Sequence, residues 1–339
     1  MLERLLVMRK RALECAFPVS VLRALTVSAF FAAALGLASG YQVLGLSRDY
    51  ENYFLFFDFV RSSSVTGIFA HRHEPGFSLL VFMLSRLSLS NVAIYSSIAA
   101  LCVFMKYQAL GTSKNYWLVV VIFTFYYAAR YLTLFEMTVI RATVAASIAF
   151  FVFYRKTDYG YDWRDVLWLI LATLMHYSAF VFIFIYFLQL RSRASVIAIG
   201  SLVFVAIAVS KNLALAYLSE TTAVFSTYSS FNKATFLPIP FAVDIAFLGF
   251  VLANWKINDQ VMKTCAIGMT MAVVFHFSLL EYSLIAARFR EILSFFSILY
   301  VVRAVGYSTD NMKVAALAYA VASSVLHLYI FYIYDPLLT

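Results

Sequence analysis

Long, almost uncharged apolar stretches dominate this sequence and restrict the folds that it can adopt. They fall at about 19–46, 91–110, 115–131, 137–154, 165–190, 194–210, 237–254, 261–280, 285–303 and 313–333. Most are close to the roughly 20 residues that a helix needs to cross the hydrocarbon core of a bilayer. They are continuous and do not alternate in hydrophobicity as the strands of an outer-membrane barrel do. The sequence therefore predicts an all-α, polytopic membrane protein.

Composition excludes the soluble alternatives. Only 13% of the 339 residues are charged and 63% are hydrophobic, whereas a soluble domain carries about 25% charged residues. The formal net charge of +9 would suggest nucleic acid in a soluble protein. In a membrane protein, basic residues that hold cytoplasmic loops in place explain it better. We expect one integral membrane domain over residues 1–339, with no nucleic-acid partner, no metal site and no cofactor.

Two segments leave the number of spans ambiguous. The stretch 76–90 carries Arg86 and, as a helix, is about 22 Å long, less than the ~30 Å hydrocarbon core. The stretch 165–190 has His176 near its centre, so it forms either one tilted helix or a hairpin of two short helices that meet at His176.

Placement of the basic residues decides between these arrangements. With a cytoplasmic N-terminus, a non-spanning 76–90 and a hairpin at 165–190, 16 of the 26 Lys and Arg residues lie inside and 10 outside. If 76–90 spans, the split becomes 12 inside and 14 outside. The positive-inside rule favours the first arrangement. It predicts about 11 transmembrane helices, two of them short, and an interfacial helix in the first periplasmic loop.

Two long loops fall outside in this arrangement, at 47–90 and 211–236. The first is rich in aromatic residues, which include Tyr50 and Tyr53, and the second in Ser and Thr. Aromatic faces among hydroxyl groups are typical of a sugar-binding groove, and an interfacial aromatic belt is the alternative explanation. Eight of the ten outside basic residues are arginines, which suit bidentate recognition of phosphate or carboxylate.

Four short motifs follow one another in this part of the chain: Asp49-Tyr50-Glu51-Asn52-Tyr53, Glu74-Pro75-Gly76-Phe77, Ile140-Arg141 and His176-Tyr177-Ser178. Their order and spacing over residues 47–190 resemble the EpsG-like exopolysaccharide polymerases, which are related to the Wzy O-antigen polymerases. Two positions depart from the family pattern. Ala142 stands where Gln is common, and Tyr177 stands where Lys is common.

The resemblance implies a GT-C-like fold and a membrane glycosyltransferase of the bacterial inner membrane, with its active site on the periplasmic face. The implied donor and acceptor are polyprenyl-pyrophosphate-linked oligosaccharides, joined by inverting transfer without a nucleotide cofactor. Membrane lipid, a chain-length regulator and a flippase are the other expected partners.

Glycosyl transfer of this kind needs a base for the acceptor hydroxyl and cations for the pyrophosphate leaving group. The base candidates are Asp49, Glu74 and His176, and the sequence does not rank them. The candidate pyrophosphate-binding and substrate-binding residues are Arg141, Arg288, Arg290, Tyr50, Tyr53 and Glu281.

Each main candidate also has an ordinary structural explanation. Asp49 can cap a helix, and Glu74 can be a first-turn acid before a proline at the first helical position. His176 can be a neutral core histidine, and Arg288 can pair with Glu291 one turn later. Asp244, within its apolar stretch, is a candidate buried partner for Arg141, Arg288 or Arg290.

Three other functions stay open. A flippase or other transporter predicts two similar halves and a central charged path, neither of which is visible in the sequence. A membrane acyltransferase that modifies surface glycan needs a path for a cytoplasmic acyl donor, whereas the intramembrane ionisable residues cluster towards the outer side. An O-antigen ligase-like transferase shares the donor chemistry of a polymerase, so the sequence does not separate these two functions.

Overall fold

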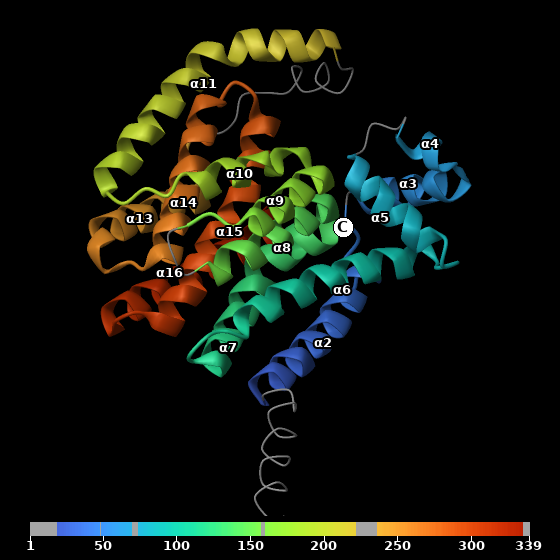
Figure 1. The fold of residues 1–339 in the computed structure, drawn as a ribbon, viewed down its shortest axis with the longest axis horizontal. Helices are drawn as coiled ribbons and strands as arrows, with labels where there is room; N and C mark the ends of the chain where they lie inside the picture. Colours follow the sequence, from blue (N-terminus) through green and yellow to red (C-terminus); the bar gives the residue numbers. More distant parts are fainter. Residues whose placement is uncertain (1–18, 48, 70–73, 157–159, 222–235, 335–339) are drawn as a thin grey trace, which may run out of the picture.

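The computed structural model describes residues 19–334, except 48, 70–73, 157–159 and 222–235. Over these residues the chain is a bundle of helices (Figure 1), as the apolar stretches predict. The elements are α2 (Val19–Gly40), α3 (Tyr50–Ser62), α4 (Val65–Phe69), α5 (Pro75–Ser85), α6 (Asn91–Leu110), α7 (Tyr116–Tyr127), η1 (Ala128–Thr138), α8 (Ile140–Arg155), α9 (Trp163–Met175), η2 (Tyr177–Ala179), α10 (Phe180–Phe187), α11 (Arg193–Thr221), α13 (Ile239–Ala253), η3 (Trp255–Ile257), α14 (Gln260–Ser278), α15 (Ser283–Tyr307), α16 (Asp310–Tyr329) and η4 (Ile330–Tyr334).

Six helical segments within the described residues are long and apolar enough to cross a membrane, against the 11 spans expected. They are Val21–Gly40, Asn91–Leu110, Tyr116–Thr138, Arg193–Lys211, Gln260–Ser278 and Asp310–Tyr334. Three shorter apolar helices lie among them, at Pro75–Ser85, Tyr177–Phe187 and Ile239–Ala253. The chain is therefore a multi-pass helical membrane protein.

Small residues bring α2 and α6 together, and the two helices run side by side along one edge of the bundle (Figure 1). A Cβ atom added to Gly40 would lie 1.8 Å from the Ser96 hydroxyl oxygen. Further along, Gln108 of α6 donates to the Ser28 hydroxyl of α2 at 3.1 Å, so the helices are antiparallel. Close backbone approach through small residues is the usual way in which membrane helices associate, because lipid provides little hydrophobic driving force between them.

The first loop begins and ends at the same end of the bundle. Gln42, just after α2, and Tyr95, in the first turns of α6, both donate hydrogen bonds to the carbonyl of Met137. The chain therefore does not change ends between them. α5, in that interval, has 11 residues and is about 16 Å long, too short to cross a bilayer. These facts agree with the prediction that the 76–90 segment does not span.

Three helices, α3, α4 and α5, occupy the loop in which one interfacial helix was expected, and they gather on one flank of the molecule (Figure 1). α3 buries residues at the i, i+3, i+4 and i+7 positions of one face, the spacing of an amphipathic helix. These buried residues are Tyr53, Phe56, Phe57 and Val60.

The 165–190 segment is a hairpin, as one of the two sequence readings predicts. α9 stops at His176, whose backbone is extended, and α10 returns alongside α9. At the open end of the hairpin, Gln189 and Gly160 exchange two hydrogen bonds of 2.8 and 3.0 Å. His176 therefore lies at the closed tip, and we call this end of the bundle the His176 end.

One predicted boundary is wrong. The expected break between 131 and 137 is absent, because α7 continues as the π-helix η1 up to Thr138. The apolar span before the second long loop ends at Lys211, and α11 continues as a helix into the expected loop at 211–236 up to Thr221. Residues 222–235 of that loop lie outside the described part of the chain.

The hairpin makes a prediction about labelling. Tyr161 and Arg193 flank the open end of the hairpin and are exposed, and exposed Thr66 lies in the first loop. In a background without native cysteines, we expect an impermeant thiol reagent to reach Tyr161→Cys and Arg193→Cys from one side of the membrane and Thr66→Cys from the other. Labelling of Tyr161→Cys and Arg193→Cys from opposite sides would show that 165–190 crosses the membrane as a single span.

Candidate active site

Three of the predicted site residues form one cluster at the His176 end. The carboxylate of Glu74 accepts a hydrogen bond from His176 Nδ1 at its Oε1 atom, at 2.9 Å. Its Oε2 atom accepts a hydrogen bond from Arg141 Nη1. The three side chains come from three separate segments, just before α5, at the start of α8 and at the tip of the hairpin. The Glu74 side chain is only 6% exposed, so this is a largely buried ion pair and hydrogen-bond network.

The residues after Glu74 explain how the carboxylate reaches this position. Pro75 occupies the first helical position of α5, where its missing N–H is not needed, and it favours the extended backbone of Glu74. A Cβ atom on Gly76 would lie 2.8 Å from the backbone oxygen of Leu174 in α9. Only glycine lets the start of α5 approach the end of α9 this closely, and His176 is two residues further along.

Arg141 is the second residue of α8, and its side chain is 27% exposed. The neighbouring residues Ala142, Ala145, Ala146 and Ser147 are small and buried, so α8 packs closely within the bundle. Only part of the guanidinium is occupied by Glu74. Within the described part of the chain, the Arg141 Nε atom is buried and has no hydrogen-bond partner. A buried donor without a partner is uncommon in proteins.

Electrostatics keep Glu74 ionised. Burial alone would raise the pKa of its carboxyl group, but the hydrogen bond from His176 and the charge of Arg141 outweigh burial and lower the pKa to about 2. Because the two partners are on other segments, this carboxylate ties α5 to both α8 and the hairpin.

Tyr53 connects this cluster to α15. It is buried on α3 and packs edge-on against Phe77, the residue after Gly76. Burial raises the pKa of the Tyr53 hydroxyl, and the charges of Arg141 and Arg288 both oppose this effect. The charge of Arg141 has the larger effect on this hydroxyl, and the charge of Arg288, 147 positions further along the chain, has the smaller one. Arg288 also contacts Glu291 at 3.5 Å, the pair that the ordinary explanation predicts, and it is 40% exposed.

The other predicted residues lie around this cluster or away from it. Asp49 is at the N-cap position of α3 but makes no side-chain capping hydrogen bond. Tyr50 donates its hydroxyl to the Gly40 carbonyl at the end of α2. Glu281 pairs with Lys211 at 2.9 Å. The guanidinium of Arg290 lies 5.7 Å from the centre of the Phe241 ring, on the side of a second network.

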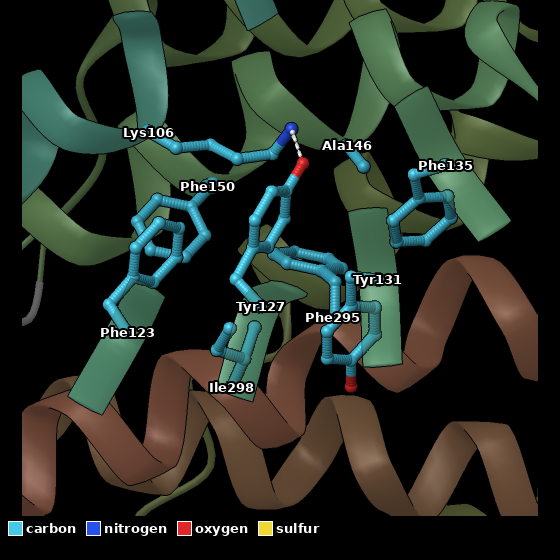
Figure 2. A pocket seen from close by; sticks show the side chains of 9 residues that line it. All are labelled: Lys106, Phe123, Tyr127, Tyr131, Phe135, Ala146, Phe150, Phe295 and Ile298. Atoms are coloured by element: carbon cyan, nitrogen blue, oxygen red, sulfur yellow. Dashed lines mark hydrogen bonds between the residues drawn. The ribbon is translucent and has the colours of Figure 1, made fainter. Parts of the chain in front are cut away.

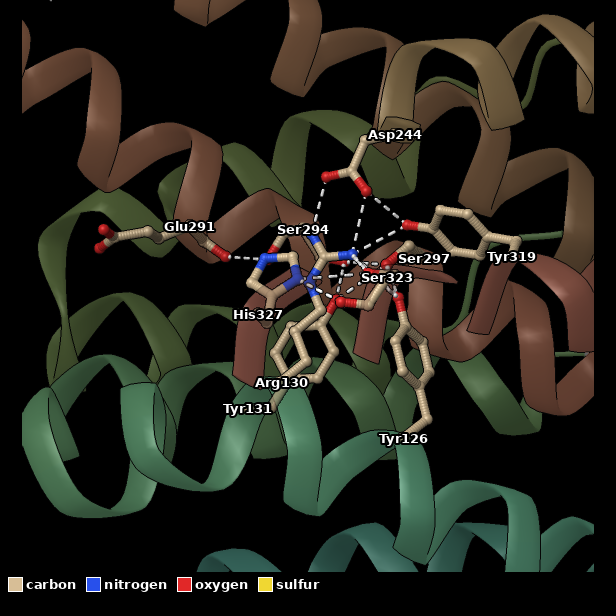
Figure 3. A network of polar contacts seen from close by, with 10 residues as sticks. All are labelled: Tyr126, Arg130, Tyr131, Asp244, Glu291, Ser294, Ser297, Tyr319, Ser323 and His327. Atoms are coloured by element: carbon tan, nitrogen blue, oxygen red, sulfur yellow. Dashed lines mark hydrogen bonds and ion pairs between the residues drawn. The ribbon is translucent and has the colours of Figure 1, made fainter. Parts of the chain in front are cut away.

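That second network surrounds Arg130 of η1 and was not predicted as a unit (Figure 3). Arg130 forms a two-pronged ion pair with Asp244 of α13, at 3.0 and 2.7 Å. It also donates to the hydroxyl groups of Tyr126, Tyr319 and Ser323. Asp244 therefore does have an arginine partner, but the partner is Arg130 and not Arg141, Arg288 or Arg290. Through these contacts the Arg130–Asp244 pair connects α7, η1, α13 and α16.

A third polar contact lies deeper in the bundle. Lys106 of α6 is buried and pairs with Glu136 of η1 at 2.6 Å. Lys106 also donates to the Tyr127 hydroxyl beside a cavity of about 10 Å³, lined mainly by aromatic and aliphatic side chains (Figure 2). A cavity of this size holds at most one water molecule. It is not a substrate site.

The low pKa of Glu74 predicts a pH-dependent contribution to stability. A carboxyl group whose pKa falls on folding stabilises the folded state above its ordinary pKa of 4.5, and this contribution is lost as the pH falls towards about 2. The size of the shift corresponds to about 3 kcal/mol at neutral pH. We therefore expect Glu74→Gln to lower the melting temperature of the detergent-solubilised protein near pH 7. The difference from the unmodified protein should shrink between pH 4.5 and 2. A constant difference over that range would contradict this assignment.

Comparison with known proteins agrees with these observations. The family model of the EpsG family matches residues 25–337. No curated protein and no solved structure matches the chain. The match covers nearly the whole described bundle, including the segments that contribute Glu74, Arg141 and His176. This chain is a member of the EpsG family.

Proposed function

We propose that this protein is a polysaccharide polymerase of the bacterial inner membrane. It joins polyprenyl-pyrophosphate-linked oligosaccharide repeat units on the periplasmic face by inverting glycosyl transfer, in a GT-C-like fold. The observation that carries the proposal is the convergence of Glu74, Arg141 and His176 at one end of the bundle, with Arg288 nearby, in a member of the EpsG family.

The cluster contains the groups that the reaction needs. A carboxylate and an imidazole are the usual proton acceptors for a sugar hydroxyl. Arginines stabilise the negative charge that grows on a departing pyrophosphate, and the Arg141 side chain is 27% exposed, so part of it is open to a ligand. The aromatic residues of α3 border this cluster through Tyr53 and provide apolar surface for a glycan. A chain-length regulator and a flippase are the protein partners that we propose.

Separate polar networks weaken the transporter alternative. A transporter moves its substrate along a path lined by polar groups. The buried charged residues that the structure describes instead form separate pairs or clusters around Glu74, Arg130, Lys106 and Arg303. A ligase-like transferase remains the second candidate, because it uses the same donor and the same leaving group.

The glycan of a deletion strain separates the polymerase from the ligase. If this protein is the polymerase, we expect the strain to accumulate the lipid carrier, or the surface acceptor, capped with a single repeat unit. Expression of the intact gene should restore long chains. Long lipid-linked chains that do not reach the surface acceptor would indicate a ligase instead.

The two arginines make a second prediction. Lys keeps the positive charge but loses the planar fork of Arg, so Arg141→Lys and Arg288→Lys should each reduce polymerisation strongly. A lost contact to the departing charge lowers the rate about a hundredfold. The matched control is Arg61→Lys, since Arg61 forms an exposed pair with Asp58 in the first loop. The measurement is the chain-length distribution at equal membrane abundance. Normal chains in both variants, as in the control, would remove these arginines from the site.

A further inference from the structure

The contacts of Glu74 distinguish it from the other base candidates. Both of its oxygens accept hydrogen bonds, one from His176 and one from Arg141. These partners hold its pKa at about 2 in spite of burial. A carboxylate that is so weakly basic is a poor acceptor for the proton of a sugar hydroxyl, because an efficient base titrates near the working pH. The geometry therefore does not favour Glu74 as the base.

The same contacts fix the orientation of the His176 ring. An ionised carboxylate can only accept hydrogen bonds, so His176 Nδ1 carries a proton and donates it to Glu74 Oε1. In the neutral ring the lone pair is then on Nε2. Among the described residues, His176 makes its hydrogen bond through Nδ1 alone, and its side chain is 19% exposed. Nε2 is thus free to meet a substrate group at the tip of the hairpin.

Asp49 has no comparable contact that orients its carboxylate among the described residues. It is half-buried at the start of α3, and its backbone N–H hydrogen-bonds to Ser47, but no capping contact orients its carboxylate. Its charge acts on Tyr53, one turn further along α3. His176 differs from both in this respect. Its ring is oriented by Glu74, and its basic Nε2 atom makes no hydrogen bond to the described residues.

We propose that His176 is the catalytic base of the polymerase and that Glu74 is the positioning residue that holds its ring. This assignment rests on the function proposed above. The arrangement has the logic of the Asp–His pair in serine proteases, in which a buried carboxylate fixes the tautomer and orientation of the imidazole.

The reaction then balances without another reactant. Nε2 of His176 takes the proton of the acceptor hydroxyl, and the hydroxyl oxygen forms a bond to the anomeric carbon of the donor. The bond from that carbon to the pyrophosphate oxygen breaks, and its electron pair leaves with the pyrophosphate, near Arg141 and Arg288. The imidazolium is stabilised by Glu74 and later releases its proton to water.

Glu74 also couples the two halves of this reaction. One of its oxygens holds the base and the other holds Arg141, so the proton acceptor and the cation for the leaving group are fixed relative to each other. Glu74 before α5 contacts His176, and Arg141 on α8 contacts the other oxygen of Glu74. α15, which carries Arg288 and Glu291, packs against η2, the segment directly after His176. Asp49 acts on Tyr53 of α3. Of these, Glu74 is the one in direct contact with the ring.

The test measures rate against pH for the purified full chain in liposomes. The probe is the polyprenyl-pyrophosphate-linked repeat unit that accumulates in the deletion strain, and the readout is the rate of chain lengthening between pH 5 and 9. The variants are His176→Ala, Glu74→Gln, Glu74→Asp and the His176→Ala/Glu74→Gln double variant. Asp58→Asn is the matched control, because it neutralises an exposed carboxylate that pairs with an arginine in the same loop. Monodisperse elution of each variant in detergent reports folding.

We expect the rate of the unmodified protein to have an acid limb, because general base catalysis is lost when the base is protonated. His176→Ala should reduce the rate by roughly a thousandfold and remove this acid limb, since general base catalysis contributes about 10²–10⁴-fold. Glu74→Gln should reduce the rate at least about a hundredfold and move the acid limb to lower pH, because the charge that favours the imidazolium is gone. Glu74→Asp should recover part of the rate. The double variant should be no slower than His176→Ala, because the two residues act as a unit.

Other outcomes would overturn the assignment. A Glu74→Gln variant that is slower than His176→Ala, or a double variant whose loss is the product of the two single losses, would make Glu74 an independent catalytic group. An unshifted acid limb in Glu74→Gln would show that Glu74 does not act through His176. Failure of the unmodified protein to lengthen the probe would contradict the polymerase function itself, which is a separate result.

Discussion

A buried carboxylate determines how the rest of this bundle must be arranged. An ionised carboxylate that leaves water loses several kcal/mol of solvation, so it is stable inside the protein only with charged or hydrogen-bonding partners. Glu74 meets this requirement through Arg141 and His176, one on each oxygen. Both partners belong to segments that are distant in sequence. The first loop, α8 and the α9–α10 hairpin therefore have to meet at one point.

Local backbone features allow the first loop, α8 and the hairpin to come into contact at Glu74. Pro75 starts α5 directly after Glu74, and Gly76 lets α5 approach the backbone of α9. The extended backbone at His176 ends α9 and turns the chain back, so that the imidazole is at the tip of the hairpin and not on a helix face. Within a bilayer, a break in a helix is tolerated only where it is enclosed by protein or lines a polar cavity. The backbone features that bring these segments together and the residues of the proposed site thus occur at the same place.

Much of this arrangement could be predicted from the sequence. The length of the 165–190 stretch and its central His176 are compatible with a hairpin, and the 76–90 stretch is too short to span the membrane.

The π-helix η1 could not be predicted, because apolar periodicity does not distinguish it from a loop that separates two spans. The partners of Arg130 and Lys106 also depend on tertiary contacts, with Asp244 and with Glu136. An ionisable residue within an apolar stretch was the available signal for both. Arg290 was grouped with Arg141 by its place in the sequence, whereas its side chain lies beside Phe241.

An experimental structure with the polyprenyl-pyrophosphate-linked repeat unit bound tests the central claim most directly. This account predicts that the pyrophosphate contacts Arg141 and Arg288, and that the hydroxyl group of a second glycan lies within hydrogen-bond distance of His176 Nε2. A pyrophosphate bound at the Arg130–Asp244 network, or on a face of the bundle remote from the Glu74 carboxylate, would contradict it.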